Sequence, residues 1–335
     1  MQFKHILGID ISKLTLDLCL LSGSIVLDHL QIANDPKDIK KQIPKLLKTY
    51  GINLTEVLFS MEHTGIYNTP VVRWLESQKA HIWVLSAIEI KRSMGMVRGK
   101  SDKIDCERIA LYTLRNQDKL NLWIPASPEV IKLSRLLALR AGLIKSKKQL
   151  SVGTNELQGY VDHDIIKQLK SNVKPVLDAI NKQISEIEKQ MMSIINTNEN
   201  LKRLYVLSTS VPGVGPIVAI NMIVKTGEFK TINHPKKLAC YAGVVPFEQS
   251  SGTSLKIKPR VSHMADKTLK TLLHLAATSA VQGNGELKEY YQRKVAEGKS
   301  KMLVINAIRN KIIHRVYACI TRNRPYEKNY YGAIA

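Results

Sequence analysis

Five short apolar runs in the first 120 residues constrain the fold more than any other feature of this sequence. Three of them follow one another with only short polar breaks, which is the pattern of a three-stranded meander. The other two alternate with amphipathic stretches typical of helices. We expect strands at residues 6–11, 15–21, 25–32, 57–61 and 81–85, and helices at residues 36–50 and 69–78. A meander followed by alternating helices and strands predicts a mixed α/β sheet.

Four acidic residues occupy special places in this pattern. Asp10 interrupts the first apolar run, and Glu62 directly follows the fourth. Asp102 and Asp105 lie three positions apart in a predicted helix, and therefore on one face of it. An RNase H-like sheet brings residues in these places to one site. Adjacent carboxylates repel each other unless a cation lies between them, so we predict that the four hold two Mg²⁺ ions about 4 Å apart, as phosphodiester cleavage requires.

Each acid alone also has an ordinary explanation. Asp10 can be a turn residue, Glu62 can neighbour a helix cap, and most Asp pairs with this spacing lie on solvated helix surfaces. The order of the four residues along the chain is what favours a common metal site.

The charge of the chain points to a polyanionic partner. The 335 residues contain 50 Lys and Arg against 28 Asp and Glu, a net charge of +22, which favours nucleic acid. A basic protein of the membrane surface is the alternative, but no apolar run reaches the roughly 18–20 residues of a membrane-spanning helix. The four cysteines are far apart and indicate neither a disulfide framework nor a zinc site. We therefore expect an intracellular protein without a membrane partner.

The remainder of the chain is predicted to be mainly helical. Apolar residues spaced three and four apart form a heptad seam, which either packs inside one chain or pairs two chains. The seam consists of Leu177, Ile180, Ile184, Ile187, Met191 and Ile194. We expect an α/β domain at residues 1–125, a helical coiled-coil region at 126–203 and a mainly α-helical domain at 204–335.

Two further segments favour phosphate contacts. A glycine and proline turn at residues 211–216 leads into an apolar helix, and such a turn either binds a phosphate through backbone N–H groups or only joins two helices. Residues 288–328 contain eleven Lys and Arg against three Glu, so the terminal helices are plausible nucleic-acid contacts.

Six blocks of the sequence together resemble the DEDD transposases of the insertion-sequence one-ten family, whose N-terminal domain is RuvC-like. The N-terminal blocks are Gly8–Lys13, Met61–Tyr67 and Lys100–Cys106, and the C-terminal blocks are Val211–Pro216, Ala239–Pro246 and Gln249–Gly252. The resemblance covers nearly the whole chain in the right order.

This resemblance implies a recombinase of bacterial cytoplasm that moves an insertion sequence. It implies that the RuvC-like acids hold Mg²⁺ and that a serine attacks DNA to form a phosphoserine. The matching serine is Ser251, which we expect to lie in a turn with Ser250, the neighbouring alternative. Tyr241, Tyr290 and Tyr291 are the other candidate attacking groups. The resemblance further implies double-stranded donor and target DNA, a structured non-coding guide (bridge) RNA, and a homo-oligomer, either a dimer or a tetramer.

Three other functions remain open from the residues alone. One is a RuvC-like junction-resolving nuclease that uses only the acids. The second is an actin-like ATPase or sugar kinase, because Gly8–Ser12 also resembles the first phosphate-binding strand of that fold. The third is a non-catalytic RNA-binding protein.

Overall fold

The computed structural model describes residues 2–86, 88–90, 102–157, 159–251, 255–261 and 264–328. The chain divides into two compact units, residues 1–125 and residues 126–335. Each unit has its own hydrophobic core. The predicted boundary near residue 203 lies inside the second unit, and a separate domain at 126–203 stays a prediction.

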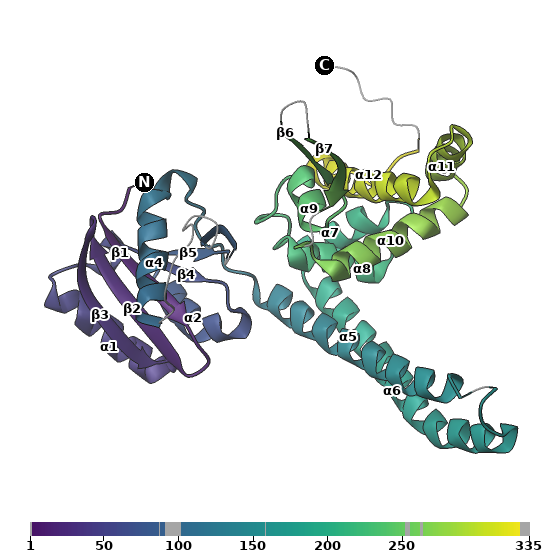
Figure 1. Ribbon diagram of the computed structural model, residues 1–335, viewed down its shortest axis with the longest axis horizontal. Coiled ribbons are helices and arrows are strands. Elements are labelled where there is room, and N and C mark those ends of the chain that lie inside the picture. The colour runs from purple at the N-terminus through teal and green to yellow at the C-terminus, as the bar shows by residue number, and fades with distance from the viewer. Residues whose placement is uncertain are drawn as a thin grey trace. The chain divides into compact units, whose positions relative to one another are not determined.

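The first unit is built on a five-stranded sheet (Figure 1) with the order β3-β2-β1-β4-β5. The first three strands form an antiparallel meander, and β4 and β5 continue the sheet parallel to β1. The strands are β1 (His5–Ile11), β2 (Thr15–Ser22), β3 (Ile25–Ala33), β4 (Val57–Glu62) and β5 (His81–Leu85). The prediction of a mixed α/β sheet is confirmed.

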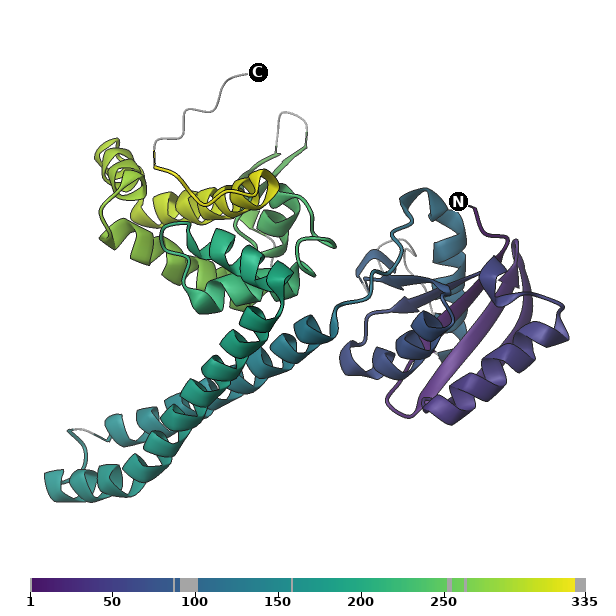
Figure 2. The same cartoon turned by 180° about the vertical axis from the view of Figure 1, so that it is seen from behind.

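Successive residues of a strand point to opposite faces of the sheet, and both faces of this sheet carry buried apolar residues. Helices therefore cover both faces. Helices α1 (Pro36–Thr49) and α2 (Thr69–Ser77) pack on the face that carries Leu7 and Ile9, as Figure 2 shows from behind. Helix α4 (Asp102–Arg115) packs on the opposite face, which carries Ile6 and Leu58. The side chains on this second face are the ones that α4 can reach.

The second unit is mainly helical. Its helices are α5 (Pro128–Asn155), α6 (His163–Thr197), α7 (Glu199–Thr209), α8 (Pro216–Lys225), α9 (Pro235–Tyr241), α10 (Lys267–Gln282), α11 (Glu286–Ala296) and α12 (Lys301–Arg322). Helices α5 and α6 form a long hairpin (Figure 1). Ile187 and Met191 of the predicted heptad seam are buried in the core of this unit. No helix in the described ranges is long and apolar enough to cross a membrane.

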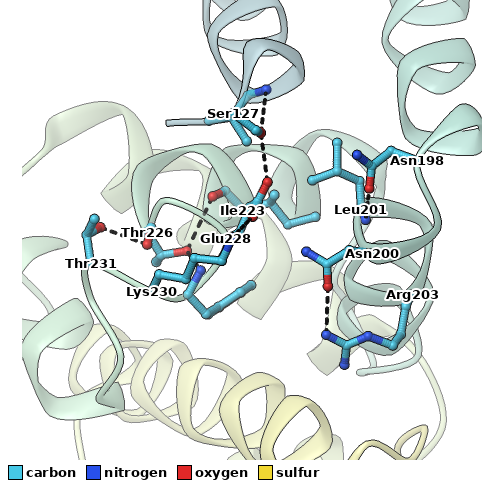
Figure 3. Close-up of polar contacts among 12 residues, drawn as sticks. Ser127, Asn198, Asn200, Leu201, Arg203, Ile223, Thr226, Glu228, Lys230 and Thr231 are labelled. Carbon is cyan, nitrogen blue, oxygen red and sulfur yellow. Dashed lines mark hydrogen bonds and ion pairs between the residues drawn. The ribbon is translucent and has the colours of Figure 1, made fainter. Parts of the chain in front are cut away.

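A polar junction fixes the start of α5 within the second unit (Figure 3). The hydroxyl of Ser127 caps α5 and donates a hydrogen bond of 2.8 Å to Oε1 of Glu228, which also forms an ion pair with Lys230. Glu228 and Phe229 both adopt left-handed backbone conformations. Thr226 stabilises this turn, because its Oγ1 accepts a hydrogen bond from the backbone N–H of Phe229 at 2.9 Å.

One β-hairpin interrupts the helices of the second unit. Strand β6 (Pro246–Ser251) pairs antiparallel with strand β7 (Leu255–Val261). The sequence predicts a turn in a mainly helical domain here. The strands were missed because residues 252–263 combine polar and basic residues without a long apolar alternation.

Candidate active site

Asp10 and Glu62 lie at the ends of neighbouring parallel strands. The paired residues of β1 and β4 run from His5 and Val57 to Ile9 and Met61, so each acid follows the last pair directly. Alternation along the strands places Asp10 on the face of Gly8, and Glu62 on the face of Leu58, which belongs to the core under α4. Both carboxylates therefore belong to the face of the sheet that α4 covers.

Helix α4 runs antiparallel to β1. The side-chain amide of Gln117, just beyond its C-terminal end, exchanges hydrogen bonds with the backbone of Phe3, which precedes β1. Cys106, near its N-terminal end, packs directly against Gly8. The N-terminal end of α4 consequently lies at the same end of the sheet as Asp10. Asp102 is the first residue of this helix, and Asp105 lies one turn further on.

The electrostatics of Cys106 support this placement of Asp10. A hydrogen bond with Cys19, burial, and the negative charges of Asp17 and Asp10 together raise the pKa of the Cys106 thiol. Asp10 is therefore close enough to the N-terminal half of α4 to act on it. The negative charge that gathers here repels further negative charge and attracts cations.

The described side chains do not by themselves form a metal site. Oδ1 of Asp105 forms an ion pair of 2.8 Å with Nη1 of Arg108, and both side chains are largely buried. Over the residues whose side chains are described, no group of three or more His, Cys, Asp or Glu is close enough to hold a metal ion. The side chain of Asp102, like Lys100 and Ser101, lies outside the described residues.

The candidate nucleophile lies at the far end of strand β6. Ser251 pairs with Leu255, and Ser250 pairs with Lys256. These two serines are strand residues, whereas the sequence predicts that they lie in a turn. Their side chains and Gly252 lie outside the described residues.

Tyr241, which the sequence also offers as an attacking group, is engaged elsewhere. Its hydroxyl lies 3.1 Å from Oδ2 of Asp266. Burial raises the pKa of Tyr241, and the nearby carboxylate of Asp266 adds to this effect against the opposing charge of Lys225. A tyrosine with a raised pKa is a weaker nucleophile at neutral pH, so its ionic neighbours favour an anchoring role. No local sequence pattern indicates this cluster of Lys225, Tyr241 and Asp266, because its members are far apart along the chain.

Part of the basic C-terminal segment is engaged within the protein. Arg309 is buried and contacts Nδ1 of His274 at 2.6 Å, and Arg315 forms an ion pair of 2.7 Å with Glu286. Lys311 instead lies over the ring of Tyr290, 4.6 Å from its centroid, which leaves its charge available to an external phosphate. Within this segment, the prediction of nucleic-acid contacts therefore applies to the Lys and Arg side chains that face outward, such as Lys311.

Comparison with known proteins finds a transposase family model for each part of the chain. Residues 7–162 match a family model of DEDD transposases of the IS110 type, and residues 206–292 match the model described as "Transposase IS116/IS110/IS902 family". Together with the order of the sheet, the first match confirms the RNase H-like fold predicted for the N-terminal part.

Individual relatives agree with these matches. The pilin gene-inverting protein of Moraxella bovis is 26% identical over 333 residues, which cover 97% of this chain and 98% of that protein. The transposase for insertion sequence element IS1328 of Yersinia enterocolitica is 21% identical over 68% of this chain and 74% of its own length. The transposase for insertion sequence element IS1111A of Coxiella burnetii is 24% identical over 43% of this chain and 39% of its own length.

Proposed function

The chain belongs to the IS110/IS116/IS902 family of transposases, and we propose that it cuts and rejoins DNA through a serine nucleophile assisted by Mg²⁺. Its DNA cleavage and strand transfer follow from the family. The finer assignment of residues rests on one observation above all. Asp10, Glu62 and the N-terminal end of α4 lie at one end of one sheet, on one face of it.

Asp10, Glu62, Asp102 and Asp105 would hold the metal. Members of the DEDD transposase family typically use divalent metal ions, and a set made only of carboxylates suits the oxygen-binding Mg²⁺. The fit requires Asp105 to exchange its ion pair with Arg108 for the metal, and Asp102 to complete the set from one turn earlier. Bound Mg²⁺ would stabilise the charge that develops on the phosphate oxygens during the displacement.

Ser251 would supply the covalent step. Its Oγ forms a bond to the phosphorus while a bond from phosphorus to a deoxyribose oxygen breaks. The serine proton is lost, and the departing oxygen takes up a proton. The phosphodiester energy is kept in the phosphoserine, so attack by a DNA hydroxyl on that phosphorus rejoins the strand and releases the serine. A serine needs activation for such an attack, which is why the nucleophile and the acids must act on one phosphate.

The proposed partners are double-stranded donor and target DNA, a structured guide RNA and further copies of the chain, acting in the bacterial cytoplasm. The net charge of +22 supports nucleic-acid partners. Exposed apolar side chains along the α5–α6 hairpin support self-association. Leu139, Ile165 and Val176 are about half exposed there, at 53%, 48% and 49%.

A second candidate function is site-specific DNA inversion. Two relatives that match this chain over nearly its whole length are pilin gene-inverting proteins of two Moraxella species. Inversion uses the same cutting and rejoining, but both recombining sites lie on one DNA molecule. A plasmid with two inverted sites distinguishes the two functions, because inversion keeps all of the DNA and transposition moves a segment to a new place.

The deciding experiment maps the covalent adduct between protein and DNA. The protein, with the RNA that copurifies with it, is incubated with a plasmid that carries the gene and its flanking DNA. Ser251→Ala should abolish the adduct, whereas Ser250→Ala should retain measurable activity. An adduct on Ser250 would move the assignment by one position, and an adduct on a tyrosine would overturn the serine mechanism. Metal-dependent cleavage without any adduct would favour the junction-resolving nuclease.

A further inference from the structure

The β6–β7 hairpin is held to the second unit mainly at its base. Over the described residues, β6 and β7 contact chiefly each other, and Figure 1 shows them extending from the helices beside α9 and α12. The chain enters the hairpin from Tyr241 at the end of α9 and leaves it toward Asp266, which caps α10. The backbone N–H of Asp266 donates a hydrogen bond of 2.9 Å to the carbonyl oxygen of Tyr241. The segments that lead into and out of the hairpin are thus tied directly to each other.

Three side chains strengthen this connection. Nζ of Lys225, the last residue of α8, lies 2.8 Å from Oδ2 of Asp266, and the hydroxyl of Tyr241 lies 3.1 Å from the same oxygen. Oδ1 of Asp266 accepts a hydrogen bond of 2.7 Å from the backbone N–H of Leu269. The carboxylate of Asp266 therefore links the ends of α8 and α9 to the start of α10. Its side chain is only 12% exposed, so solvent screens these contacts little.

A second contact holds the incoming arm of the hairpin. Nδ2 of Asn306, on α12, donates a hydrogen bond of 2.7 Å to the carbonyl oxygen of Val244, two residues before β6. This bond fixes the position of the arm, but it touches neither Asp266 nor β7. The cluster of Lys225, Asp266 and Tyr241 differs from this contact in joining the segments on both sides of the hairpin to the helices.

A small tilt at the base of the hairpin displaces Ser251, because this residue lies at the far end of β6. Pro246 pairs with Val261 at the base of the hairpin, and Ser251 lies five residues further along β6. At the usual rise of a strand this distance is about 17 Å. A tilt of about 3–4° at the base would displace Ser251 by about 1 Å, and a displacement of that size can lower a reaction rate by about 100-fold.

We propose that Lys225, Asp266 and Tyr241 form a clamp that positions the β6–β7 hairpin and thereby aims Ser251 at the DNA. The three are positioning residues, since none of them touches the reacting atoms. The proposal rests on the proposed role of Ser251 as the nucleophile. Two separate results are expected when the clamp is broken. The hairpin should become more mobile, and the covalent step should slow while DNA binding persists.

Asp266→Asn is the central variant. Asparagine also caps helices well, so α10 keeps its start while the charge that binds Lys225 is lost. Removing a negative charge does not weaken the attraction of DNA, so a slower covalent step in this variant reports position. Lys225→Met and Tyr241→Phe break the other two contacts, and Lys225→Arg keeps the charge. Glu297→Gln is the matched control, because it breaks the comparable contact of Glu297 with Lys294 on α11.

Two measurements on the full-length protein test the clamp. The first is hydrogen–deuterium exchange of the β6 and β7 amides in the free protein. The second is the rate of adduct formation on the plasmid described above, with the dissociation constant for the same DNA measured in parallel. We expect faster exchange in the hairpin, an adduct rate about 10- to 100-fold lower and nearly unchanged DNA binding for Asp266→Asn and Lys225→Met. Lys225→Arg should restore most of the rate, and Glu297→Gln should match the unmodified protein.

The outcomes separate this proposal from the one on which it rests. Unchanged exchange in the hairpin of Asp266→Asn would overturn the clamp. Faster exchange with an unchanged adduct rate would overturn the positioning role. Equal losses of adduct rate and DNA binding would likewise overturn it, because a general structural defect then explains the result. An adduct that persists in Ser251→Ala would instead overturn the nucleophile assignment, whatever the exchange measurement gives.

Discussion

Gly8→Ala tests the contact that places α4 against the sheet. A Cβ atom on Gly8 would lie 2.3 Å from the carbonyl oxygen of Cys106 and 2.7 Å from Cβ of Ala110. Ordinary contacts begin at 3.4 Å, so α4 must retreat by about 1 Å in an interior that is otherwise close-packed. Overpacking of this kind costs about 1–3 kcal/mol of unfolding free energy. The retreat also moves Asp102 and Asp105 away from Asp10, and a shift of about 1 Å predicts a loss of DNA cleavage of about 100-fold.

Tryptophan fluorescence makes the stability measurement specific for the first unit. The chain has three tryptophans, Trp74, Trp83 and Trp123, and all three lie within residues 1–125. Urea unfolding followed by fluorescence should therefore show a lower midpoint for Gly8→Ala. Gly142→Ala is the control, because the position lies in α5 with nothing within 4 Å of the added Cβ. It should leave the fluorescence transition and the activity unchanged. A Gly8→Ala protein with the normal midpoint and normal cleavage would refute the reasoning.

Three further outcomes are expected. Asp10→Asn removes one negative charge with little change of shape, so DNA cleavage should collapse in a nicking assay while the fluorescence midpoint stays close to normal; normal cleavage would exclude Asp10 from the site. Binding of DNA and RNA should weaken steeply with salt, by about 1,000-fold between 50 and 200 mM if some six phosphates are neutralised, as filter binding can measure; a flat response would contradict phosphate contacts. Burial and the charge of Arg309 lower the pKa of His274 below its ordinary 6.5. The second unit should therefore keep its stability above that pH and lose some as the pH falls through the lowered pKa. Circular dichroism melting should show this loss, and His274→Gln should diminish it.

Local patterns in the sequence predicted most elements of the first unit. The apolar run expected at 57–61 is strand β4, Val57–Glu62, and the helix expected at 36–50 is α1, Pro36–Thr49. Such elements are predictable because alternation and helical periodicity are properties of neighbouring residues. The same patterns place Asp10 within a strand and Glu62 directly after one. The assignment of these acids and Ser251 to one reaction stays a prediction.

The elements that depend on distant pairing were not predictable in this way. Ser250 and Ser251 were read as turn residues, yet they belong to a strand, because the partner strand β7 supplies the hydrogen bonds that a local pattern does not reveal. The heptad seam predicted a helix, but it did not show whether this helix packs inside one chain or against a second chain. Packing of α6 against α5 within the chain, and burial of Ile187 and Met191 in the core of the second unit, decided where part of that seam lies.

The α/β character of the first unit, the order of its acids and the excess of positive charge can be read from the order of the amino acids, because each of these is local or additive. Which groups meet depends instead on how the helices and strands pack in three dimensions. Gly8 contacts α4 almost a hundred residues later, and Lys225 meets Asp266 across the whole hairpin. These contacts arise from the direction of α4 and from the ends of three helices, which are set when cores pack and not by the spacing of residues along the chain.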